Sequence, residues 1–196
     1  MKAVKKILNN IFIDGLSGMA LGLFSTLIIG TILKQIGDLM GGTYGGYLST
    51  FAIIAQRLTG AGIGIGVAYK FKESTYVLLS AAAAGMIGAY ASNLIAGTLL
   101  SEQGALVLLG PGEPLGAFVA AYVGITVGRL VAGKTKLDLL ITPAVTILSG
   151  GAVGILVGPG VSRFMTWLGD LVNWGTEQQP ILMGIVVSVI MGMVLT

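Results

Sequence analysis

Nine residues, 108–116, read Leu-Leu-Gly-Pro-Gly-Glu-Pro-Leu-Gly and place one carboxylate, Glu113, among glycines and prolines. The ten residues before this acid and the fifteen after it are uncharged. Pro111 and Gly112 disfavour a continuous helix, whereas Pro114 suits the first position of a new one. The stretch therefore predicts a break between two apolar segments, with Glu113 at the start of the second.

The composition predicts an all-α, polytopic bundle of transmembrane helices. Hydrophobic residues make up 55% of the 196 residues and charged residues only 10%, whereas soluble domains carry about 25% charge. Uncharged runs recur, each near or above the ~18 residues that let a helix cross hydrocarbon. They cover residues 15–33, 39–56, 74–101, 139–162 and 178–196.

We expect about six spans in one transmembrane domain, 1–196. The spans fall at 11–33, 47–69, 74–99, 114–132 and 139–158, and a last one starts near 181. Residues 100–113 are too short to span and predict a re-entrant segment. Residues 161–179 carry two tryptophans, which are typical of an interfacial amphipathic piece. Because the last apolar run stops after about 16 residues without a polar end, we expect the chain to be truncated there.

Basic residues predict the orientation, because cytoplasmic loops are rich in lysine and arginine. Residues 1–10 form a basic amphipathic start that is expected on the cytoplasmic side. With the N-terminus inside, the inner segments hold 8 basic residues and the outer segments 2. The inner set is Lys2, Lys5, Lys6, Lys70, Lys72, Arg129, Lys134 and Lys136; the outer set is Lys34 and Arg163. The sequence thus predicts a multi-pass protein in the bilayer of the plasma membrane, and its net charge of +3 does not indicate nucleic-acid binding.

Glycine makes up 32 of the 196 residues, about 16%, against a usual share of about 7%. Most of these glycines lie within the apolar runs, where small residues let transmembrane helices approach closely. The excess also suits broken helices. The chain contains neither cysteine nor histidine, which excludes disulfides, thiolate metal sites and histidine catalysis; we expect no metal and no cofactor.

Few polar residues could form a site in such a chain, and Glu113 is the first of them. A carboxylate beside an apolar helix usually serves a substrate, an ion or a partner, and the alternative is a solvated acid that caps a surface helix. Arg57 and Gln56 lie inside the second expected span, and an intramembrane arginine is a candidate on the same ground, unless it reaches an interface. Asn93, in the third span, is either a ligand for a solute or a contact between helices.

Residues 110–114, Gly-Pro-Gly-Glu-Pro, resemble the Gly-Ile-Thr-Glu-Pro motif of enzyme IIC, the membrane component of phosphotransferase-system sugar transporters. The glycine, glutamate and second proline match, and the two middle residues differ. The wider chain is similar to IIC-like sugar permeases and regulators. The resemblance implies that Glu113, flanked by Gly112 and Pro114, hydrogen-bonds the sugar and helps deprotonate the hydroxyl that is phosphorylated.

The leading hypothesis is a IIC-like sugar permease whose solute lies among Glu113, Gly112, Pro114, Arg57, Gln56 and Asn93. Any enzymatic role is that of the membrane component of a sugar phosphotransferase, which needs a separate phosphorylated IIB-type protein on the cytoplasmic side. The alternative is a membrane-embedded sensor or transcription regulator on the same scaffold without phosphotransfer, and a third reading is a pore for small solutes. The resemblance and the glycine-rich faces also favour a homodimer.

Overall fold

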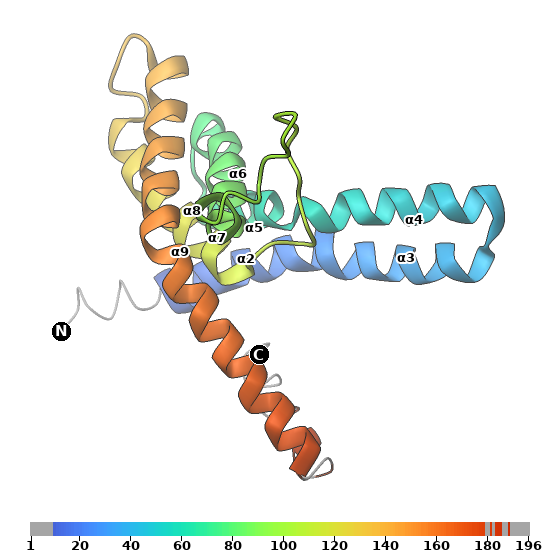
Figure 1. The fold of residues 1–196 in the computed structure, drawn as a ribbon. Coiled ribbons are helices and arrows are strands. Elements are labelled where there is room, and N and C mark those ends of the chain that lie inside the picture. Colours follow the sequence, from blue (N-terminus) through green and yellow to red (C-terminus); the bar gives the residue numbers. More distant parts are fainter. Residues whose placement is uncertain (1–9, 179–180, 182, 186–187, 189–196) are drawn as a thin grey trace. The chain divides into compact units, whose positions relative to one another are not determined.

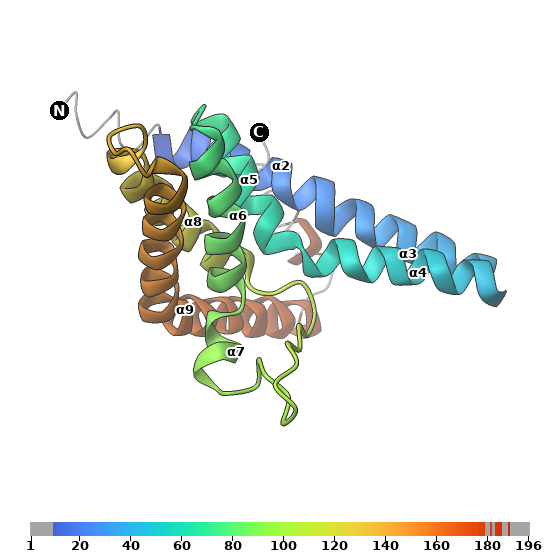
Figure 2. The same ribbon diagram turned by 90° about the horizontal axis from the view of Figure 1, so that it is seen from above.

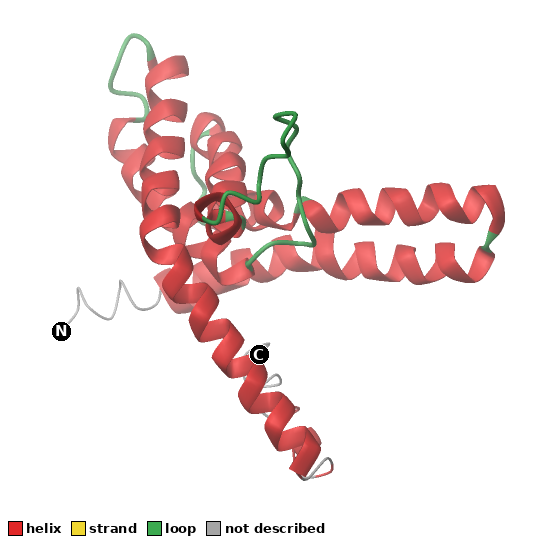
Figure 3. Cartoon of the chain, in the orientation of Figure 1, coloured by secondary structure: helices red, strands yellow, loops and turns green. Residues whose placement is uncertain are grey.

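A computed structural model describes residues 10–178, 181, 183–185 and 188, and the regular elements of that part are all helices (Figure 3). The chain divides into two compact units, Met1–Pro159 and Gly160–Thr196, which are described separately below. The all-helical class expected from the sequence is confirmed. In order, the elements are η1 (Asn10–Gly15), α2 (Leu16–Leu23), η2 (Phe24–Ile28), α3 (Ile29–Met40), α4 (Gly42–Arg57), α5 (Thr59–Lys70), α6 (Thr75–Ala89), α7 (Ala91–Ile95), α8 (Pro114–Val131) and α9 (Asp138–Gln178).

The first helical run is longer than the expected span of 11–33. It continues from Ile11 to Met40, with π-helical turns at η1 and η2. Lys34 and Asp38 lie in its last turns and pair at 2.7 Å, so both charges are compensated within the helix. The chain then turns at Gly41 and returns as α4, and the two views show α3 and α4 side by side as a hairpin (Figures 1 and 2).

The second expected span, 47–69, is a broken pair of helices. The α4 and α5 helices meet at Leu58 and are bent by 53° relative to each other. Such a break leaves helix carbonyls without their usual donors, and in an apolar environment each unpaired group is costly. Thr59 donates its hydroxyl to the Gln56 carbonyl at 2.6 Å, so side-chain donors replace part of the missing backbone pairing.

The core of the first unit forms where α5 packs against α2, α6 and α8. Most of its buried side chains are small or branched, including Ile63, Val67, Val77, Ala81 and Ile125. Glycines bring the helix backbones together, since a Cβ on Gly64 would collide with the carbonyl group of Ala81. This agrees with close packing through small residues.

The Gly-Pro-Gly at residues 158–160 predicted the end of a helix, and this prediction is wrong. The α9 helix continues from Asp138 to Gln178 through both Pro143 and Pro159. A proline removes one helical hydrogen bond, but transmembrane helices tolerate the loss when local adjustments satisfy the freed group. Residues 161–178 are thus the continuation of α9, the part from Gly160 onward belonging to the second unit.

Among the described residues, three helices are long and apolar enough to cross a membrane, or four when the bent pair α4–α5 counts as one. These are Ile11–Met40, Pro114–Val131 and Asp138–Glu177. The α6 helix is apolar but shorter. The count of six spans, the single domain and the cytoplasmic N-terminus stay predictions, and the basic start and most of the last span lie outside the described residues.

Candidate functional site before α8

An irregular segment of 18 residues, 96–113, joins α7 to α8. It turns back on itself at an isolated antiparallel bridge between Leu100 and Leu106. Gly97, Gly104 and Gly110 adopt positive φ within it, which glycine does without a steric penalty. The non-helical backbone agrees with the expected break, and its entry into the membrane stays a prediction.

The end of this segment is held against the end of α6 by a backbone hydrogen bond and by close packing. The Glu113 amide donates a hydrogen bond of 2.7 Å to the Ala89 carbonyl. Gly112 has a φ of +75°, and a Cβ there would lie 2.8 Å from the Ala89 Cβ. Both the backbone conformation and the close approach therefore require glycine at position 112, and they fix the place at which Glu113 leaves the turn.

Tyr90 makes the second contact that holds this segment in place, and it was not predicted from the sequence. Its side chain is only 2% exposed. Its hydroxyl donates to the Gly110 carbonyl at 2.6 Å and lies 3.3 Å from the Arg57 carbonyl oxygen. A buried tyrosine hydroxyl generally finds a partner, so a tyrosine between two alanines at the end of an alanine-rich helix was the signal available. Tyr90 thereby joins the α4–α5 break to the Gly-Pro-Gly turn.

Glu113 occupies the N-cap position of α8 in an extended conformation, with Pro114 as the first helical residue. Its side chain is partly buried and makes no capping hydrogen bond. Burial raises the pKa of the Glu113 carboxyl, and the nearby Leu115 amide, which favours the anion, opposes the rise only in part. The acid is therefore positioned by its backbone, and its carboxylate lies beside the Leu115 amide.

The other predicted site residues have separate partners. Gln56 donates its amide to the Thr31 hydroxyl at 3.0 Å, and the Asn93 amide is 3.4 Å from the Thr98 hydroxyl. Arg57 has an exposed side chain, and the ion pairs found in the described part of the chain do not include it. Through Tyr90, the structure links the backbone of Arg57 to Gly110 in the turn before Glu113. A ligand role for Gln56, Asn93 and the Arg57 side chain stays a prediction.

A second polar pair joins the α5–α6 turn to the end of α8. Glu73 and Arg129 form an ion pair with 3.9 Å between the carboxylate oxygen and the guanidinium nitrogen, and the Glu73 side chain is 11% exposed. Burial raises the pKa of Glu73, and the positive charge of Arg129 partly opposes the rise. Within residues that the structure describes, no group of three His, Cys, Asp or Glu side chains could hold a metal ion.

Comparison with known proteins places the amino-acid sequence of the chain in a family. Searches of curated proteins and of solved structures each gave no match. A family model described as "Phosphotransferase system, EIIC" matches residues 13–196, which include the broken helix pair, the glycine turn and Glu113. The chain therefore belongs to the EIIC family of the phosphotransferase system and is a membrane component of that system.

Proposed function

We propose that this EIIC protein transports a sugar and that the carboxylate of Glu113 binds sugar hydroxyl groups. One observation carries the proposal: Glu113 is held at the start of α8 by two hydrogen bonds, through its own amide and through Gly110, while its side chain has no capping bond. A carboxylate is a strong acceptor for hydroxyl donors. A sugar needs several such partners and no compensating charge, which suits a chain with few ionisable groups.

A phosphotransfer step would use the same carboxylate. In that step the sugar hydroxyl oxygen forms a bond to phosphorus, the bond between phosphorus and the residue of a phosphorylated IIB-type partner breaks, and the hydroxyl proton passes to Glu113. A raised pKa makes the carboxylate a better proton acceptor for this purpose. The 196 residues contain no cysteine or histidine, so the proposed step takes the phosphoryl group from a IIB-type partner.

The test is uptake of radiolabelled hexoses, pentoses and polyols into liposomes that contain the full-length protein. Glu113→Gln keeps the size of the side chain and removes the charge, and we expect it to lower uptake at least tenfold. Glu102→Gln is the matched control, because Glu102 is an exposed acid in the same segment; its uptake should equal that of the wild type. Equal uptake by both variants would refute the role of Glu113. Binding without flux would instead favour the sensor hypothesis.

A further inference from the structure

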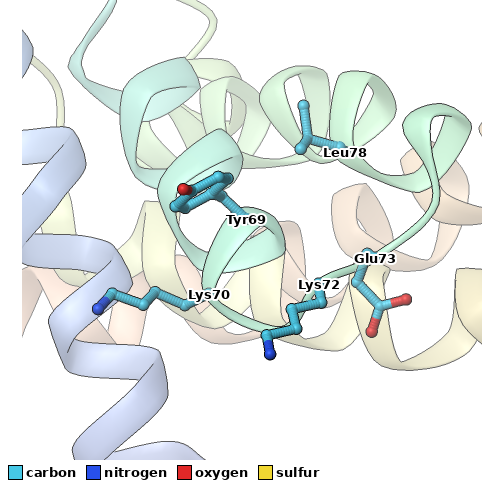
Figure 4. Close-up of a pocket in the computed structure, with 5 residues that line it drawn as sticks. All are labelled: Tyr69, Lys70, Lys72, Glu73 and Leu78. Carbon is cyan, nitrogen blue, oxygen red and sulfur yellow. The ribbon is translucent and has the colours of Figure 1, made fainter.

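Two open pockets of the first unit meet at one side chain, Tyr69. One, of about 370 Å³, lies at the end of α5 and is lined by Tyr69, Lys70, Lys72, Glu73 and Leu78 (Figure 4). The other, of about 430 Å³, is a groove between α5 and the α2–η2 run, and Tyr69 lines it as well. Tyr69 lines both pockets, so the cationic pocket and the apolar groove adjoin at this residue.

The cationic end holds two lysines without a carboxylate partner. In Figure 4 Lys70 extends toward the neighbouring blue helix, Lys72 extends below the turn, and the carboxylate of Glu73 is directed away from Lys70. Glu73 pairs with Arg129 instead. The ion pairs of the described residues include neither lysine. The pocket therefore carries two positive charges that an anion could compensate.

Lys72 occupies a position at which glycine is usual. Its amide bonds the Tyr69 carbonyl at 3.0 Å, and the next amide, that of Glu73, bonds the Ala68 carbonyl at 3.1 Å. This is the Schellman pattern that ends α5, with Lys72 at the left-handed position and a φ of 55°. Within the described part of the chain it is the single non-glycine residue with positive φ. A lysine at a site that favours glycine indicates a use for its side chain.

The apolar end follows one face of α5. Gly62, Ile65 and Tyr69 line it from this helix, and Leu21 and Ser25 line it from the other side. From position 62 to position 69 the helix rises about 10 Å, a length that matches a stretch of hydrocarbon chain. The groove thus leads along the helix toward the two lysines.

We propose that this surface binds one anionic phospholipid, with its phosphate at Lys70 and Lys72 and one acyl chain in the groove. The pairing of a cationic pocket with an adjoining apolar groove matches the two chemical parts of such a lipid. Free phosphate would leave the groove empty. The proposal is independent of the sugar site, because it uses none of that site's residues.

The first test measures lipid binding by native mass spectrometry of the full-length protein in detergent, titrated with phosphatidylglycerol or phosphatidylcholine. We expect the wild type to retain phosphatidylglycerol preferentially. Each lysine near a membrane surface contributes enough to anionic-lipid affinity that Lys70→Gln with Lys72→Gln should weaken binding roughly 10- to 30-fold. Lys134→Gln with Lys136→Gln is the control, since it removes equal charge from the α8–α9 loop. Equal losses in the two double variants would overturn the proposal.

Two further variants test whether a loss of lipid binding reflects misfolding, and whether the surface binds something other than a lipid. Lys72→Gly relieves the left-handed backbone, so it should bind the lipid severalfold more weakly while its thermal midpoint stays equal or rises. Ser25→Trp fills the groove and should weaken phosphatidylglycerol binding at least fivefold. Gln35→Trp, at a position on α3 outside the groove, is the control and should leave this binding unchanged.

Displacement of the lipid by millimolar inorganic phosphate, with no effect of Ser25→Trp, would show a phosphate site only. A lipid-independent disulfide between two Ser25→Cys chains would show that another copy covers the groove. Either result overturns the proposal.

Discussion

The phenolic hydroxyl of Tyr90 donates a hydrogen bond of 2.6 Å to the carbonyl oxygen of Gly110. This bond connects a helix end to the turn that carries Glu113, although the two residues are 20 positions apart. The same hydroxyl lies beside the Arg57 carbonyl at the α4–α5 break. One buried side chain therefore holds two irregular parts of the backbone in a fixed relation.

Tyr90→Phe removes the hydroxyl that donates this bond and keeps the aromatic ring. It leaves the Gly110 and Arg57 carbonyls without the hydroxyl, and a buried polar group that loses its partner costs about 1–3 kcal/mol. We expect the free energy of unfolding, measured by far-ultraviolet circular dichroism in detergent, to fall by that amount. We also expect sugar uptake to fall, because the turn is no longer held. Tyr44→Phe, at a side chain 81% exposed, should change neither quantity; a similar loss in both variants would contradict the assigned role.

Gly112→Ala tests the close approach of the turn to α6. The added Cβ meets the Ala89 Cβ at 2.8 Å at a φ of +75°, so it adds a clash of about 1–3 kcal/mol to a backbone penalty of about 1 kcal/mol. Gly104→Ala is the matched control, because Gly104 has a φ of +77° with open space around it. We expect only the backbone penalty there. Equal unfolding free energies for the two variants would show that the turn does not pack on Ala89.

The helix break before α8 could be predicted from the sequence because its signals are local. Pro111, Gly112 and Pro114 act on neighbouring dihedral angles, and the N-cap position of Glu113 followed from them. The partners of the turn could not be predicted in this way. Ala89 and Tyr90 lie in a separate helix, and only the fold brings them to the turn. The hydrogen bond from Gln56 to Thr31 on α3 has no local signal in the sequence either, because the fold alone brings the two residues together.

Glu73 predicts a pH dependence of stability. Burial raises its pKa in the folded state above its ordinary value of 4.5, so the folded state binds this proton more tightly than the unfolded state. The contribution of Glu73 to stability must therefore fall as the pH rises from 4.5 through the folded pKa. We expect the thermal midpoint of the wild type, relative to that of Glu73→Gln, to decrease over that range.

Arg129→Gln provides a second test of the pH dependence assigned to Glu73. Arg129 opposes the rise in the Glu73 pKa, so its removal should extend the decrease to higher pH. A wild-type midpoint that rises with pH relative to Glu73→Gln would contradict the assigned direction.

Two helical glycines should respond in opposite ways to alanine. Gly46 in α4 faces open space, and Gly64 in α5 abuts the backbone of Ala81. In a helix, alanine is favoured over glycine by about 1 kcal/mol. Gly46→Ala should therefore raise the unfolding free energy slightly, whereas Gly64→Ala should lower it by separating α5 from α6. If both substitutions are stabilising, α5 and α6 do not pack as described.

The glycine content predicted close helix packing, but it could not predict which glycines make it. Gly46 and Gly64 are both in apolar surroundings in the sequence, and only the three-dimensional contacts distinguish them. The Gly-Pro-Gly at 158–160 shows the same limit. It has the same local signals as the turn at 110–112, yet α9 continues through it.

Direct contact between Glu113 and a sugar hydroxyl is the central claim, and a double-mutant cycle with deoxy sugars tests it. The affinities of wild-type protein and of Glu113→Gln are measured for the transported sugar and for each of its monodeoxy analogues. At one hydroxyl position, deoxygenation should weaken wild-type binding about 10- to 100-fold, the range for a hydrogen bond to a charged group. The same deoxygenation should weaken binding to Glu113→Gln less, because glutamine makes only a neutral hydrogen bond. Losses that add independently at every hydroxyl position would contradict the claim.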